Sequence, residues 1–171
     1  VVVATKTTAI PSVASNLSRV LGTISDDPEG PLVLSFQNGI DPGRELVERL
    51  GHTRVLRMVL SLGAIRSDDG SHVRVTLNQP PHAIGSIDPA LKECSETVAG
   101  WLTSGGLETR YVRDIESAVW AKGIVNAAVN PVAALVNCSI GEVLDSPSHT
   151  IVTQLLEEGV AVARAEEIEL P

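Results

Sequence analysis

Short apolar runs and helix-like apolar spacing alternate along the first fifty residues. The runs at 1–5 and 32–36 are continuous, which is typical of strands buried on both faces of a parallel sheet. Residues 11–21 instead carry apolar side chains at helical spacing, and a second helix is predicted from the Asp-Pro pair at 41–42 to Gly51. The order strand–helix–strand–helix predicts parallel α/β units.

The middle of the chain carries a different pattern. Residues 55–62 form a further apolar run, whereas apolar and polar residues alternate at 73–77, so one face is expected to be wet there. The Asp-Asp-Gly turn at 68–70 lies between these segments and predicts that they pair as antiparallel strands. Further elements are expected as a short strand at 83–87, a helix from 88 to about 102, and a strand at 107–112.

Strand patterns cease in the last third of the chain. A helix capped by Asp114 is expected to run to about Asn130, where Pro131 should interrupt or kink it before a short helical piece at 132–136. A final helix is expected to begin after Ser146.

The change of pattern near Arg113 is the best candidate for a domain boundary. We expect a mixed α/β domain over 1–113, with parallel strands and an antiparallel hairpin, and an all-helical domain over 114–171. With 171 residues and 43% apolar content, the chain can build a hydrophobic core.

The charge balance argues against a nucleic-acid partner. The 13 Lys and Arg residues stand against 21 Asp and Glu residues, which gives a net charge of −8, and only 2% of residues are aromatic. Apolar runs such as 1–4 and 32–34 are far shorter than the about 20 residues that cross a bilayer. No nucleic-acid or membrane partner is therefore expected.

The cysteines and histidines predict neither a disulfide nor a metal site. Cys94 and Cys138 lie far apart, which favours two reduced thiols in a cytoplasmic protein. The four histidines are scattered without the spacing of metal ligands: His52, His72, His82 and His149.

The strongest chemical pattern is a polar stripe on an otherwise apolar predicted helix. Lys122, Asn126 and Asn130 follow one another at i, i+4 and i+8, so they lie on one helix face. A helix so apolar is expected to be largely buried, and an amine followed by two amides in a protected space suits a small anionic molecule that carries hydroxyl groups. The alternative is that the three side chains only bond to neighbouring helices or solvent.

Two further candidates follow predicted parallel strands. Lys6 and Asn38 each come directly after an apolar run, so both should lie at the carboxyl edge of the sheet, where ligands bind in open α/β folds. Taken singly, Lys6 could be an ordinary surface lysine, and Asn38 with Gly39 could be a common turn.

These residues together resemble the ketopantoate reductase family. VVVATK at 1–6 is similar to its strand that ends in a lysine, LSFQNG at 34–39 to its strand that ends in an Asn-Gly turn, and AIG at 83–85 to its hairpin segment. The most specific part is DIESAVWAKGIVNAAVNPVAALVNCSIGEVL, which follows the family pattern W-x-K-x3-N-x3-N-P.

The resemblance implies a Rossmann-type domain that binds NADP(H), joined to a helical domain like that of 6-phosphogluconate dehydrogenase relatives. Lys6 and Asn38 would contact the cofactor, and the backbone of Ala64 would border the nicotinamide. No metal is implied. The enzyme would act in the cytoplasm on a small anionic 2-oxo acid and would form a homodimer.

The implied reaction is reduction of 2-dehydropantoate to pantoate, in pantothenate and coenzyme A biosynthesis. Lys122 would be the general acid that protonates the carbonyl oxygen, and an ammonium group suits this task. Asn126 and Asn130 would hold hydroxyl and carboxylate groups of the substrate, together with Asn38.

The chain departs from the family pattern in ways that keep other functions open. It has no GxGxxG loop, and we expect it to cover only the central portion of the family, without the later serine and glutamate of the site. Because the loop that cradles the phosphates is absent, these 171 residues alone are expected to bind the cofactor weakly and to turn over little substrate. Ile140 stands where the family often has a substrate-contacting asparagine. The alternatives are a reductase of another 2-oxo acid and a truncated, non-catalytic paralogue or interaction module.

Overall fold

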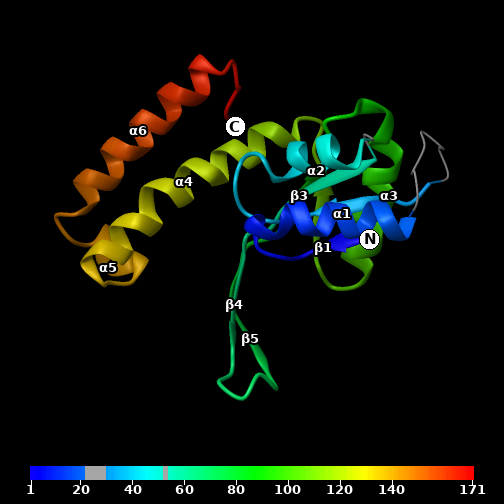
Figure 1. The fold of residues 1–171 in the computed structure, drawn as a ribbon. Helices are drawn as coiled ribbons and strands as arrows, with labels where there is room; N and C mark the ends of the chain where they lie inside the picture. The colour runs from blue at the N-terminus through cyan, green and yellow to red at the C-terminus, as the bar shows by residue number, and fades with distance from the viewer. Residues whose placement is uncertain (22–29, 52–53) are drawn as a thin grey trace. The chain divides into compact units, whose positions relative to one another are not determined.

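The computed structural model describes residues 1–21, 30–51 and 54–171, so His52 lies outside the described residues (Figure 1). The chain divides into two compact units, Val1–Ile115 (unit 1) and Glu116–Pro171 (unit 2). Each unit is described by itself below.

The described part of unit 1 contains a five-stranded sheet with the order β1-β2-β3-β6-β7. The first three strands are parallel, β6 runs antiparallel to β3, and β7 is parallel to β6. The carboxyl ends of β1, β2 and β3 therefore share one edge of the sheet, and those of β6 and β7 lie at the opposite edge. The strand bounds are β1 (Val2–Val3), β2 (Val33–Ser35), β3 (Val55–Val59), β6 (His82–Gly85) and β7 (Thr109–Tyr111).

Helices cover both faces of this sheet, because neighbouring residues of a strand point to opposite sides. Val33 packs in a core cluster with residues of α1 (Ile10–Leu21) and α2 (Pro42–Leu50). The next residue, Leu34, packs in a second cluster with residues of α3 (Lys92–Ser104). This three-layer arrangement confirms the predicted α/β class. Two short 3₁₀ helices, η1 (Thr7–Ala9) and η2 (Pro89–Leu91), precede α1 and α3.

The expectation that the first strand is buried on both faces is wrong. Val3 is buried, but Val1 and Val2 are 52% and 59% exposed. The reason is topological, since β1 lies at the edge of the sheet and pairs with β2 alone.

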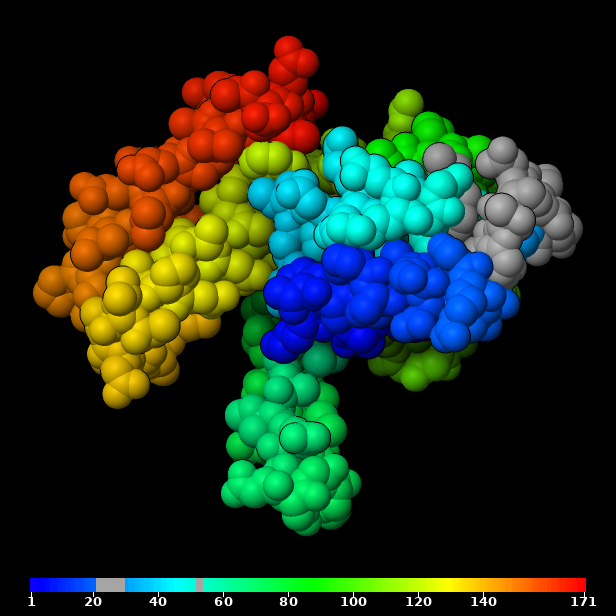
Figure 2. Space-filling view, viewed as in Figure 1, coloured from blue at the N-terminus to red at the C-terminus, as the bar shows by residue number. Residues whose placement is uncertain are grey.

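The antiparallel hairpin is present but uses different residues from those expected. The apolar run at 55–62 divides, so that β3 enters the main sheet and only Leu62 joins the hairpin. The hairpin consists of β4 (Leu62–Arg66) and β5 (Val73–Asn78), which form a separate two-stranded sheet that projects from unit 1 (Figures 1 and 2). All residues of β5 are exposed, so both faces of this strand contact solvent, whereas the sequence predicted only one solvent-exposed face.

The described residues of unit 2 are helical, as predicted. The elements are α4 (Ile115–Val136, whose first residue belongs to unit 1), α5 (Ile140–Leu144) and α6 (His149–Ala165). Their core is a cluster of small and branched apolar residues, namely Ala128, Val129, Val132, Val143 and Val152. The short helix α5 was not predicted, although Ser139 and Glu142 form a capping box at its start.

Helix α4 differs from the sequence expectation in two ways. It continues through Pro131, which lies on an exposed side of the helix, where water can satisfy the backbone carbonyl that proline leaves without its donor. It is also less buried than predicted, since Val125 and Leu135 are exposed. Helix α4 is long and apolar enough to cross a membrane. Core helices of soluble proteins have the same length and composition, so this is weak evidence for a membrane span.

Candidate functional site

A pocket of about 360 Å³ lies at the carboxyl edge of β1 and β2. Its lining brings together Lys6 and Asn38, the two residues predicted to meet at this edge. The remaining lining residues are Ala4, Thr5, Thr7, Phe36 and Gln37. We call this the Lys6 pocket. Its lining contains one cation and no carboxylate, together with hydroxyl and amide groups, which suits a ligand with anionic and hydroxyl groups.

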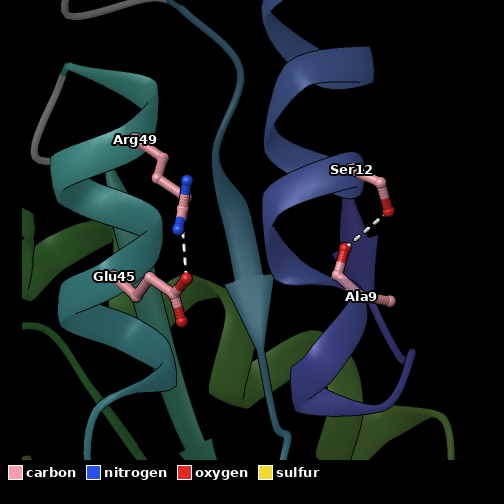
Figure 3. Close-up of polar contacts among 4 residues, drawn as sticks. All are labelled: Ala9, Ser12, Glu45 and Arg49. Carbon is pink, nitrogen blue, oxygen red and sulfur yellow. Dashed lines mark hydrogen bonds and ion pairs between the residues drawn. The ribbon is translucent and has the colours of Figure 1, made fainter.

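Local backbone structure places Lys6 in the pocket. The chain leaves β1 after Val3 and turns at Lys6, whose carbonyl accepts a hydrogen bond from the Ala9 amide at 2.9 Å. The Ser12 hydroxyl donates to the Ala9 carbonyl at 2.9 Å, which joins η1 to the first turn of α1 (Figure 3). The exposed Lys6 side chain therefore stands at a fixed point between a strand and a helix start.

The Asn38–Gly39 turn depends on glycine. Gly39 has a φ of +108°, in the left-handed region that side chains disfavour. The turn leads into α2, which begins at Pro42 and is capped after Leu50 by Gly51 with a φ of +71°, as the sequence predicted. On this helix the ion pair between Glu45 and Arg49, at 2.7 Å, is exposed, and such pairs contribute little (Figure 3).

A buried arginine lies beneath this turn, and the sequence analysis missed it. Arg57 on β3 is only 4% exposed. Its Nη2 donates to the Gly39 carbonyl at 2.8 Å, and its Nη1 donates to the Ser35 hydroxyl at 3.1 Å. The signal was present, because Arg57 is the one charged residue in the run at 55–62. A buried charge needs hydrogen-bonding partners and is seldom incidental.

The hydrogen bonds continue from Ser35 to the pocket lining. The Ser35 hydroxyl donates to Gln37 Oε1 at 2.9 Å, and Gln37 Nε2 donates to the Thr5 hydroxyl at 3.5 Å. Gln37 is buried and Thr5 is exposed, so this chain of contacts runs from the interior of the sheet to the Lys6 pocket.

Ala64 does not line the Lys6 pocket. It is exposed on β4, next to a register shift between Gly63 and Ala64 that marks a β-bulge. Its predicted contact with the nicotinamide stays a prediction.

The polar stripe lies on one helix of unit 2. Lys122 and Asn126 are half-buried on α4, and Asn130 is exposed. Their spacing on a continuous helix places them on one face, as predicted. Lys6, Asn38 and Ala64 belong to unit 1, so the predicted site residues are divided between the two units.

The described residues contain no group of three or more histidine, cysteine or acidic side chains that could hold a metal ion. Both cysteines are free thiols, with Cys94 half-buried and Cys138 exposed.

Comparisons with known proteins match both units. The family model described as "Ketopantoate reductase PanE/ApbA" matches residues 1–88. A second model, "Ketopantoate reductase PanE/ApbA C terminal", matches residues 114–171. The chain belongs to the ketopantoate reductase family. The resemblance inferred from the sequence motifs is thereby confirmed.

Individual relatives agree with this assignment. A protein of Archaeoglobus fulgidus named 2-dehydropantoate 2-reductase is 36% identical over 116 residues, which make up 68% of this chain and 38% of the relative. The crystal structure of 2-dehydropantoate 2-reductase from Geobacter metallireducens has a TM-score of 0.77 and 25% identity, and covers 94% of this chain and 51% of its own.

The fold also extends beyond close relatives. D-mandelate dehydrogenase in complex with NADH has a TM-score of 0.82 at 16% identity, and covers 99% of this chain and 54% of its own. At this identity the likeness concerns the fold alone. The chain spans 38% of the curated relative and about half of each of these two solved chains.

Proposed function

We propose that this chain takes part in the NADP(H)-dependent reduction of 2-dehydropantoate to pantoate, in pantothenate and coenzyme A biosynthesis. The observation that carries the proposal is the Lys6 pocket, a pocket at the carboxyl edge of parallel strands whose lining has one lysine, threonine hydroxyls and two amides. Membership of the family and the name of the Archaeoglobus relative support the same reaction.

The residues of unit 1 fit a nicotinamide dinucleotide. Lys6 can donate to a phosphate or ribose oxygen as an exposed ammonium, and Asn38 can donate and accept beside it. When bound, the nicotinamide would supply the hydride that reaches the carbonyl carbon. In this proposal Lys6, Asn38 and the backbone of Ala64 contact the cofactor, and residues 1–113 belong to a Rossmann-type dinucleotide-binding domain.

The residues of unit 2 fit a hydroxylated 2-oxo acid. The Lys122 ammonium would donate a proton from Nζ to the carbonyl oxygen as negative charge develops there, and would stabilise that charge before the transfer is complete. Asn126 and Asn130 follow on the same helix face, where their amides would bond hydroxyl and carboxylate groups, with Asn38 as a further contact.

The helical unit would also contribute to assembly. Residues 114–171 would form part of a substrate and dimerisation domain, and exposed apolar side chains such as Leu135, Ile151 and Val162 support association with a second copy. The two free thiols are consistent with the proposed cytoplasmic location.

Cofactor titration tests this proposal. NADPH and NADH would be titrated against the native protein, the Lys6→Ala variant and a Lys92→Ala control. Lys92 is an exposed lysine that pairs with Glu96 at 3.6 Å on α3, outside the Lys6 pocket. Loss of one charge-assisted hydrogen bond should weaken NADPH binding about 10- to 100-fold in Lys6→Ala, and the control should bind normally.

Two results would contradict the proposal. One is a native protein that binds neither nucleotide, and the other is an equal effect of Lys6→Ala and Lys92→Ala. A panel of 2-oxo acids, with NADPH oxidation as the readout, separates 2-dehydropantoate from other substrates. Other substrates are worth testing because the exposed Ile140 stands where the family often has a substrate-contacting asparagine.

A further inference from the structure

The strongest unassigned feature beside the Lys6 pocket is the buried guanidinium of Arg57. It lies on the central strand β3, and its hydrogen bonds reach the Asn38–Gly39 turn directly and the pocket lining through Ser35. Gly43 leaves room for the side chain, since a Cβ there would come within 3.3 Å of Arg57 Cδ. The arginine is thus built into the packing of β3 against the start of α2.

The Asn38–Gly39 turn has a particular need for such a contact. Both residues are exposed, and Gly39 has wide backbone freedom because it has no side chain. Its carbonyl accepts a charge-assisted hydrogen bond from Arg57 Nη2 at 2.8 Å, which fixes the peptide plane between Gly39 and Ile40, one residue after Asn38. A side chain that must meet a ligand is held more accurately when the backbone beneath it is fixed.

The second branch of the contacts ties this turn to the neighbouring strand. From Arg57 Nη1 the hydrogen bonds pass through Ser35 and Gln37 to Thr5, which lies directly before Lys6. One buried side chain therefore joins the backbone segments that carry Asn38 and Lys6.

We infer that Arg57 is a positioning residue for the Lys6 pocket. Its guanidinium holds the Asn38–Gly39 turn in the conformation that binds cofactor and 2-oxo acid. The inference rests on the proposed function. Arg57 touches neither reacting group in this account, and it acts through Gly39, Ser35 and Gln37.

A matched control exists at the other end of the same strands. Arg54 also binds a glycine carbonyl with its guanidinium, through Nε at 3.0 Å and Nη2 at 2.8 Å to Gly30. It lies at the amino ends of β2 and β3, because its own carbonyl accepts from the Val33 amide, and it is not part of the Lys6 pocket. Arg54→Met removes a similar contact without touching the Asn38 turn.

The experiment compares Arg57→Met, Arg57→Lys and Arg54→Met in the native protein. Hydrogen exchange without ligand should become faster over residues 36–41 in Arg57→Met, and should stay normal there in Arg54→Met. With NADPH and 2-dehydropantoate, Arg57→Met should raise KM about tenfold for the ligands that Asn38 contacts, which corresponds to about 1.4 kcal/mol. Arg57→Lys keeps one cationic donor and should recover part of this loss.

The outcomes distinguish failure of the Arg57 inference from failure of the proposed function. If the wild type binds ligand and Arg57→Met keeps the same KM, or if Arg54→Met raises KM equally, the inference is overturned and the proposed function stands. If the wild type binds neither ligand, the proposed function fails and the inference fails with it. Should Arg57→Met not fold, Arg57→Lys and Ser35→Ala give the same comparison, and a wild-type KM in both overturns the inference.

Discussion

The packing of α4 against α6 depends on Gly159. Replacing Gly159 with alanine should overpack this contact, which destabilises the fold, and should raise the helix propensity of α6, which stabilises it. A Cβ at this position would lie 2.6 Å from Ile124 Cγ2, 3.2 Å from Cγ1 and 3.3 Å from Cβ. Carbon atoms normally approach to about 3.5–4.0 Å, so the closest contact is about 1 Å too short. Ile124 cannot turn away, because a β-branched side chain on a helix has essentially one χ1 rotamer.

The magnitudes decide the direction. Overpacking of this kind costs about 1–3 kcal/mol, whereas Gly→Ala inside a helix stabilises by about 1 kcal/mol. We therefore expect Gly159→Ala to lower the free energy of unfolding of unit 2 by about 1 kcal/mol. Gly100 on α3 is the matched control, since it is exposed with nothing within 4 Å of its built Cβ, and Gly100→Ala should stabilise unit 1 by about 0.5–1 kcal/mol.

The two tryptophans of the chain make the assay specific for each unit. Trp101 belongs to unit 1 and Trp120 to unit 2, so urea unfolding followed by fluorescence reports unit 2 in a Trp101→Phe background and unit 1 in a Trp120→Phe background. Combined with Ile124→Ala, Gly159→Ala should cost less than it does alone, because the clashing atoms are gone. A gain of stability in Gly159→Ala equal to that of Gly100→Ala would refute the close helix contact.

Three further predictions concern the turn, the short helix and the thiols. Hydrogen bonds from the Ser67 side chain and from the Ser71 amide and hydroxyl lower the pKa of Asp69 to about 2, so a carboxyl NMR titration should place it well below 3.8. Because this folded-state pKa is depressed, the stabilisation is present above pH 4 and is lost as pH falls through 2, where amide exchange in the hairpin turn should accelerate. Ser139→Ala removes the Ser139 hydroxyl hydrogen bond, the largest cause of the lowered pKa of Glu142, and leaves the bond from the backbone amide of residue 139. The pKa of Glu142 should therefore rise part of the way toward 4.5 and α5 should unfold at lower urea concentration; an unchanged titration would exclude the capping box. Cys138 is exposed and Cys94 half-buried, so a thiol reagent should modify Cys138 first, and modification of Cys94 first would contradict their placement.

Much of the fold follows from local signals that the sequence displays directly. Pro42 and Gly51 bracket α2, and the Asp-Asp-Gly turn lies inside the hairpin as expected. The errors arise where tertiary pairing decides. Val2 belongs to an apolar run but is exposed, because its strand lies at the sheet edge, and the division of the run at 55–62 depends on which strand each half finds as a partner.

The candidate site was predictable where it depends on topology and less so where it depends on buried contacts. Lys6 and Asn38 meet in one pocket because parallel strands end at the same edge, a consequence of the predicted α/β order. Arg57 was missed because strand patterns are judged by their apolar residues, and only the packing shows that its guanidinium reaches Gly39. At Pro131 the sequence rule for proline predicted an interruption of the helix that the structure does not show. Helix α4 continues through Pro131 because the residue lies on an exposed face of the helix.

The central proposal, that Lys122 is the general acid in the reduction of 2-dehydropantoate, is tested most directly by NADPH oxidation with that substrate. The native protein, Lys122→Ala and the surface control Lys92→Ala would be compared for kcat and for NADPH affinity. We predict that Lys122→Ala lowers kcat by about 10²–10⁴-fold with NADPH affinity nearly unchanged, and that Lys92→Ala behaves as wild type. A wild-type kcat in Lys122→Ala, or no oxidation of NADPH by the native protein, would contradict the account.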